Sequence, residues 1–74
     1  MMTQEDFIAW REGLGLSRAE AARRLGLHVN SMTNYEKGRT EIPLYIGLAC
    51  AAIARGIKPW KAKSKPKEVQ DGSV

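Results

Sequence analysis

The side chains best suited to specific recognition lie on one predicted short helix, residues 29–37. An asparagine amide on such a helix can bond the N6 and N7 atoms of adenine together, and a valine or threonine methyl can touch the thymine methyl. The outward positions are Val29, Asn30, Thr33 and Asn34, with Ser31 beside them. For one isolated helix, a polar face that is merely solvated is the simpler interpretation. The neighbouring elements must therefore decide whether this face is solvated or contacts bases.

Positively charged residues lie near both ends of this region. Arg18 is the first residue of another predicted helix, residues 18–25, where a cation opposes the helix dipole. An incoming phosphate would remove that conflict, although a solvent-exposed arginine is an equal alternative. Backbone amides and cations directly after residue 36 would also suit a phosphodiester backbone. These further candidates are Lys37, Gly38 and Arg39.

Residues that could support catalysis or metal binding are isolated from one another. His28 is the sole histidine, Cys50 is the sole cysteine, and Ser17 has no histidine partner in a recognisable motif. Nucleophilic catalysis needs such a partner, and a metal cage needs several ligands. We therefore expect no enzyme activity, no metal, no cofactor and no small-molecule substrate. His28 is expected instead to cap or precede the helix at residue 29 and to contact phosphate.

Residues 16–38 predict two helices joined by a tight turn. Ser17 and Glu20 have the spacing of a capping box, in which each side chain satisfies a backbone amide at the helix start. Gly26 can then end the first helix in a left-handed conformation, and Gly38 can end the second. Two short helices around a glycine-containing turn have the plan of a helix-turn-helix, whose second helix can enter a major groove.

The rest of the chain predicts further helices and no strands. Thr3 and Asp6 resemble the start of a helix over residues 4–13. Pro43 suits the first position of a helix that runs to about residue 55, because its missing amide does no harm there. The expected fold is therefore all-α.

The helix after Pro43 is apolar around its whole circumference, which predicts burial on all sides. A small chain buries little of its surface, so a second copy is the preferred cover. The alternative is a core within one chain, completed by Ile57 and Trp60; Trp10 is expected in the core as well. The predicted dimer contacts are Leu44, Tyr45, Leu48 and Ala52.

Length and charge fit one small domain with an anionic partner. The chain has 74 residues and a net charge of +4. Residues 1–60 are expected to form the domain, and the lysine-rich residues 61–74 a basic, disordered tail. The single cysteine fits a cytoplasmic protein at the nucleoid, we find no secretory leader, and the uncharged residues 42–54 are too few for a membrane span.

Residues 14–56 resemble the DNA-binding domain of the phage Cro/C1 repressor-type family of helix-turn-helix regulators. The resemblance is carried by residues 14–17 (LGLS), 21–27 (AARRLGL) and 35–39 (YEKGR), followed by Pro43. It implies a compact bundle of four to five helices, with the helix-turn-helix at the second and third. The usual fifth helix looks short or missing, because the chain turns polar after residue 60.

The resemblance also implies functional positions. Val29, Asn30 and Asn34 fall at the family's base-contacting positions, and Arg18 stands where the family often has a phosphate-binding glutamine. Arg11 and Glu36 match positions that form an interior ion pair.

The implied function is that of a transcriptional regulator, usually a repressor, that binds double-stranded DNA as a homodimer on a pseudo-palindromic operator. The alternative is a protein-interaction module, antitoxin-like or an adaptor, that docks a partner through the apolar helix after Pro43.

Overall fold

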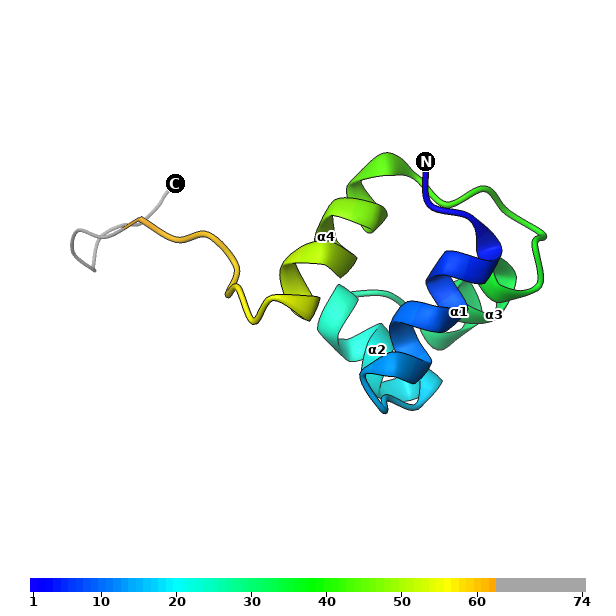
Figure 1. Ribbon diagram of the computed structural model, residues 1–74, viewed down its shortest axis with the longest axis horizontal. Helices are drawn as coiled ribbons and strands as arrows, with labels where there is room; N and C mark the ends of the chain where they lie inside the picture. Colours follow the sequence, from blue (N-terminus) through cyan, green and yellow to red (C-terminus); the bar gives the residue numbers. More distant parts are fainter. Residues whose placement is uncertain (63–74) are drawn as a thin grey trace.

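The structure, a computed structural model that describes residues 1–62, contains four helices. They are α1 (Gln4–Gly13), α2 (Arg18–Leu25), α3 (Val29–Glu36) and α4 (Leu44–Ala54). Figure 1 shows α1, α2 and α3 gathered together, with α4 alongside them. The prediction of a compact all-α bundle with a helix-turn-helix at α2 and α3 is confirmed, and the described residues contain no strand.

Local sequence signals set the helix boundaries. Thr3 and Ser17 each form a complete capping box, with Asp6 and Glu20 respectively. Gly26 ends α2 in the left-handed conformation, with φ 72°. Side chains with a β-carbon rarely adopt this backbone conformation, so the glycine allows the sharp turn into α3.

The core forms where the four helices meet, around Phe7 and Met32, which are fully buried. The Phe7 ring stacks on Trp10 and meets Tyr35 edge-on. The Trp10 indole Nε1–H donates a 2.8 Å hydrogen bond to the Cys50 carbonyl, which ties α1 to α4. Aromatic and sulfur-containing side chains therefore fix the relative positions of α1, α3 and α4.

The alternative prediction, a core within one chain completed by Ile57 and Trp60, was wrong. Ile57 is 59 % and Trp60 89 % exposed. Within one chain α4 is buried only on the side of Ile46 and Cys50, and the preferred cover of its other side, a second copy, stays a prediction. The chain turns at Gly56 and runs away from the bundle (Figure 1), and Pro59 cannot donate the amide that a continuing helix needs.

No helix follows α4 within residues 1–62, which hold four helices against the usual five of the resembled family. Among residues 1–62, no helix has the length and apolar character needed to span a bilayer. The predicted basic tail, from residue 63 onward, lies outside the described residues.

Candidate nucleic-acid interface

The second helix of the motif, α3, has one face fixed in the core and the other turned outward. Met32 is fully buried and Tyr35 nearly so, and both contribute to the core shared with α1 and α4. On the other side Val29 is 40 % exposed and Asn30 is exposed. Ser31, Thr33 and Asn34 are half-buried. The five predicted base-contacting residues thus lie on a helix whose orientation is set by packing, and the structure buries none of them.

The start of α3 is capped by a side chain. His28 is the N-cap residue, and its Nδ1 accepts a 3.0 Å hydrogen bond from the Asn30 backbone amide. Because Nδ1 is an acceptor here, the ring's remaining nitrogen, Nε2, is the one that can donate outward. The hydroxyl of Thr33 donates back to the Val29 carbonyl at 3.4 Å, so its polar group is engaged within the helix.

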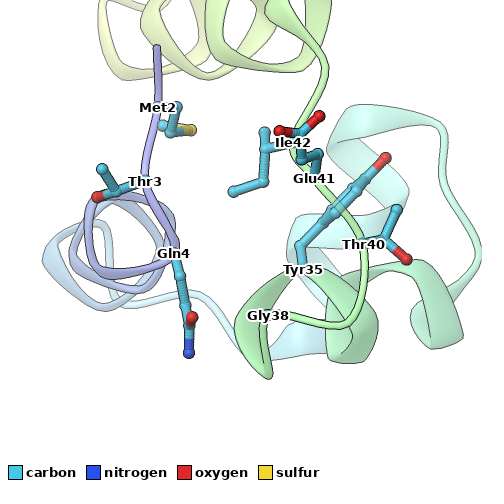
Figure 2. Close-up of a pocket in the computed structure, with 8 residues that line it drawn as sticks. All are labelled: Met2, Thr3, Gln4, Tyr35, Gly38, Thr40, Glu41 and Ile42. Atoms are coloured by element: carbon cyan, nitrogen blue, oxygen red, sulfur yellow. The ribbon is translucent and has the colours of Figure 1, made fainter.

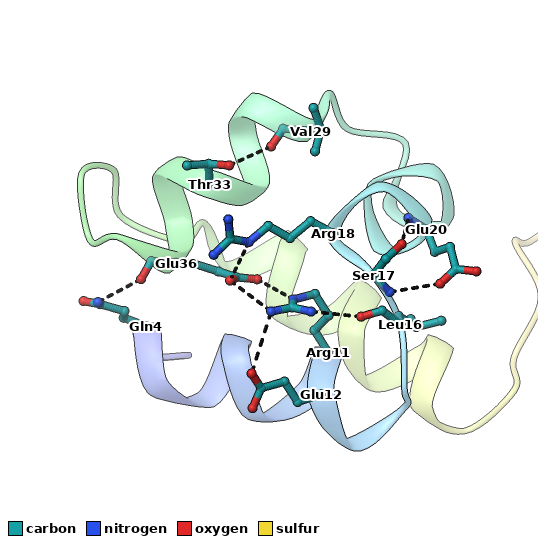
Figure 3. Close-up of polar contacts among 10 residues, drawn as sticks. All are labelled: Gln4, Arg11, Glu12, Leu16, Ser17, Arg18, Glu20, Val29, Thr33 and Glu36. Carbon is teal, nitrogen blue, oxygen red and sulfur yellow. Dashed lines mark hydrogen bonds and ion pairs between the residues drawn. The ribbon is translucent and has the colours of Figure 1, made fainter.

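The other end of α3 carries a buried carboxylate held by two arginines (Figure 3). Glu36 is 5 % exposed. Its Oε2 lies 2.7 Å from Arg11 Nε, and its Oε1 lies 3.0 Å from Arg18 Nε and 3.3 Å from Arg11 Nη2. Arg11 also donates to the Leu16 carbonyl through Nη1 at 2.9 Å. These contacts join α1, the following turn, α2 and α3 at one point.

The arginines keep Glu36 ionised despite its burial. Burial alone would raise the pKa of Glu36, but the hydrogen bonds and charges of Arg11 and Arg18 outweigh it and lower the pKa below its ordinary value. The hydrogen bonds that Arg11 donates to the Glu36 carboxylate raise the pKa of Arg11 in turn. The Glu36 carboxylate is therefore an anion at neutral pH, with a cation on each side.

Gly38 forms a turn in a backbone conformation that favours glycine. Its φ is 70°, and a β-carbon there would lie 2.6 Å from Oε1 of Gln4. The Gln4 amide comes so close because its Nε2 donates a 2.9 Å hydrogen bond to the Glu36 carbonyl. Gln4 thus supplies a partner for the C-terminal end of α3.

The backbone amides after α3 are already engaged. Those of Lys37, Gly38 and Arg39 donate to the carbonyls of Thr33, Tyr35 and Asn34 respectively, at 2.9, 3.3 and 2.9 Å. A phosphate contact in this segment therefore falls to the exposed side chains of Lys37 and Arg39. The predicted phosphate contact of Gly38 stays a prediction, and the structure adds that this residue makes the turn.

Comparison with known families decides the classification of this arrangement. A family model described as a helix-turn-helix domain matches residues 9–55. The chain belongs to this helix-turn-helix domain family. No curated protein and no solved structure matches the chain. The matched residues contain all of α2, α3 and α4 and part of α1, and membership supports DNA binding by the α2–α3 motif.

The helix-turn-helix domain leaves an apolar face of α4 uncovered. Leu44, Tyr45 and Leu48 are 63, 67 and 62 % exposed. Ala52, the fourth predicted dimer contact, is half-buried. One side of an all-apolar helix is thus in the core, and the other faces outward in the single chain.

A hollow of about 240 Å³ lies between the N-terminal end of α1 and the loop from α3 to α4 (Figure 2). It is lined by Met2, Thr3, Gln4, Tyr35, Gly38, Thr40, Glu41 and Ile42. The only carboxylate in this lining is Glu41, and the lining contains no histidine or cysteine. Over residues 1–62, no group of three or more potential metal ligands comes together.

Two contacts were not predicted from the sequence. The first is the pairing of Arg18 with Glu36, which uses a residue assigned only to phosphate. The second is the hydrogen bond from Gln4 to the Glu36 carbonyl. A signal for the first was present, because an arginine at a helix N-terminus needs a nearby anion. For the second, nothing in the local sequence relates two residues so far apart.

Proposed function

We propose that this protein is a transcriptional regulator that reads double-stranded DNA in the major groove with α3. The observation that carries the proposal is the outward face of α3, where Asn30 and Asn34 stand on a helix fixed from behind by Met32 and Tyr35. A recognition helix needs this rigidity, because hydrogen bonds to base edges tolerate little error in position. Asn30 and Asn34 read adenine in this proposal, and Val29, Ser31 and Thr33 contact adjacent base edges.

Phosphate contacts position the reading helix. Arg18 and His28 lie at the starts of α2 and α3, where anions are also favoured by the helix dipoles. Lys37 and Arg39 follow the end of α3 with exposed side chains. Affinity should fall steeply with salt, because each neutralised phosphate releases condensed counterions.

The regulator acts as a homodimer in this proposal, joined through the uncovered α4 face of Leu44, Tyr45, Leu48 and Ala52. Twofold symmetry would present two copies of α3 to successive major grooves, about 34 Å apart, on a pseudo-palindromic operator. Binding at such a site in the cytoplasm, at the nucleoid, would repress a promoter by blocking polymerase.

The same exposed face of α4 also favours a second candidate, an adaptor or antitoxin-like module that docks a different protein. The two candidates differ in what covers Leu44, Tyr45 and Leu48. A dimer measured by light scattering on the pure protein supports self-association. A monomer at high concentration that binds DNA only weakly supports the second candidate.

Selection of bound sites from random duplexes tests the proposed function. The wild-type chain should enrich one sequence with related half-sites. Asn30→Ala together with Asn34→Ala should abolish the enrichment yet leave salt-sensitive, non-specific binding. Thr40→Ala, an exposed substitution in the loop after α3, is the matched control and should enrich the wild-type sequence. If the double variant enriches the same sequence as wild type, α3 is not the reading helix.

A further inference from the structure

Arg11 and Arg18 share the Glu36 carboxylate unequally. Arg11 uses Nε and Nη2 on Glu36 and Nη1 on the Leu16 carbonyl, and its side chain is 14 % exposed. Its Nη2 also lies 3.9 Å from the carboxylate of Glu12, so every nitrogen of Arg11 is engaged. Arg18 pairs with Glu36 and with no other carboxylate among the described residues.

The geometry of Arg18 differs from that of Arg11. Its only hydrogen bond within residues 1–62 runs from Nε to Glu36 Oε1, and its side chain is 44 % exposed, against 2 % for Glu36. A guanidinium has five N–H donors in a rigid plane. Figure 3 draws no contact from either Nη atom of Arg18. Both groups therefore remain available as donors.

We propose that Glu36 is a positioning residue for DNA binding, which holds Arg18 at Nε so that its Nη groups face a phosphate of the duplex. The inference rests on the proposed function and names a part of it. The anchored side chain starts at the first residue of α2, where the helix dipole also favours an anion. Because the guanidinium is planar, fixing Nε fixes both Nη groups, and little rotamer freedom remains to be lost on binding.

The proposal and the change in net charge predict opposite effects of one substitution on DNA affinity. Glu36→Gln adds one positive charge to the chain, so long-range electrostatics alone would strengthen binding to any DNA. If Glu36 positions Arg18, the same substitution weakens binding, because the guanidinium is no longer held. Removing Arg18 from the Glu36→Gln chain should then cause little further loss.

The test measures affinity of the full chain for a short duplex of random sequence over a salt series. Arg18→Ala should weaken binding about tenfold, as for loss of one charge-assisted hydrogen bond. It should reduce the slope of log affinity against log salt by about one per bound protomer. Arg23→Ala is the matched control, because it removes the same charge from an exposed position of α2; it should change affinity much less.

Arg18→Lys separates position from charge. A lysine keeps the charge but has a single nitrogen. It therefore cannot bond Glu36 through one nitrogen and a phosphate through two others, as an arginine can. It should recover less than half of the loss, in log affinity, caused by Arg18→Ala. Full recovery would show that only charge matters and would overturn the positioning role.

The outcomes separate failure of this inference from failure of the proposed function. A wild-type chain that binds no duplex even at low salt overturns both. A chain that binds duplex, with Arg18→Ala equal to Arg23→Ala, overturns the inference alone. Stronger binding by a folded Glu36→Gln chain also overturns it. If Glu36→Gln does not fold, the comparison of Arg18→Lys with Arg18→Ala decides.

Discussion

At the scale of single residues, Glu36 is the point at which α1, α2 and α3 are joined by hydrogen bonds. Arg11 of α1 and Arg18 of α2 donate hydrogen bonds to its carboxylate. Gln4 of α1 donates to its backbone carbonyl. A buried ion pair of this kind adds little stability over an apolar substitute, yet it is costly to break, because the partner is left buried and unpaired. The cluster therefore fixes the angle between α3 and the other helices more than it raises overall stability.

Replacing Glu36 should be strongly destabilising. We expect Glu36→Gln to lower the free energy of unfolding by about 3–5 kcal/mol, the range for removing one partner of a buried pair. Urea denaturation followed by circular dichroism measures the difference, with Glu5→Gln as the control at an exposed carboxylate on α1. A change for Glu36→Gln no larger than that for Glu5→Gln would contradict the structural role.

Acid should weaken the domain through the same residue. The pKa of Glu36 is lower in the folded chain than its ordinary value of 4.5, so its stabilising effect is present above pH 4.5 and is lost as the pH falls through the folded value. The difference in unfolding free energy between wild type and Glu36→Gln should therefore shrink as the pH falls from neutral to below 4.5. A difference independent of pH would mean that the carboxylate charge is not what stabilises the cluster.

At the scale of elements, the sequence predicted the helices closely because each boundary has a local cause. Capping boxes at Thr3 and Ser17 and a left-handed glycine at Gly26 act on adjacent residues, and the structure begins and ends α1 and α2 where they indicate. The burial of α4 has no such local cause, because a helix that is apolar on all sides has no pattern to show which side is inward. Leu44, Tyr45 and Leu48, which were predicted as dimer contacts, are exposed in the single chain.

Part of the candidate site could also be predicted, because it depends on local helical spacing. The outward positions of α3 follow from helical spacing once Met32 and Tyr35 are in the core. The contact of Arg18 with Glu36 spans two helices, and its geometry depends on how α2 and α3 cross. Likewise the engagement of the amides after α3 depends on how that helix ends, which residue types alone do not give.

The end of α3 gives a test at the element scale. Gly38→Ala should destabilise the domain by more than the roughly 1–2 kcal/mol that a left-handed conformation costs a residue with a β-carbon. The excess arises because the new atom meets Gln4 and displaces its amide from the Glu36 carbonyl. Gly56→Ala is the matched control, since Gly56 has the same φ of 70° and open space around it. Equal losses of unfolding free energy for the two variants would show that the Gln4 contact contributes nothing.

At the scale of the whole molecule, the uncovered face of α4 sets the expected assembly. Leu48→Glu should convert the proposed dimer to a monomer, because it places a charge in the centre of an apolar contact. Light scattering at several concentrations measures the mass, and circular dichroism checks that the helices are retained. Ala9→Glu, on an exposed position of α1, is the control and should leave the mass unchanged. A wild-type monomer at all concentrations would contradict self-association through α4.

The central claim is that the outward face of α3 reads DNA sequence, and the ratio of affinities for the selected duplex and a shuffled one tests it most directly. The wild-type chain should prefer the selected duplex by about 10³-fold or more, as specific DNA-binding proteins do. Asn30→Ala with Asn34→Ala should bring the ratio close to one, since a bidentate contact to adenine contributes about 1–3 kcal/mol of discrimination. The double variant should still bind both duplexes weakly at low salt. A ratio unchanged by the two substitutions would contradict the account.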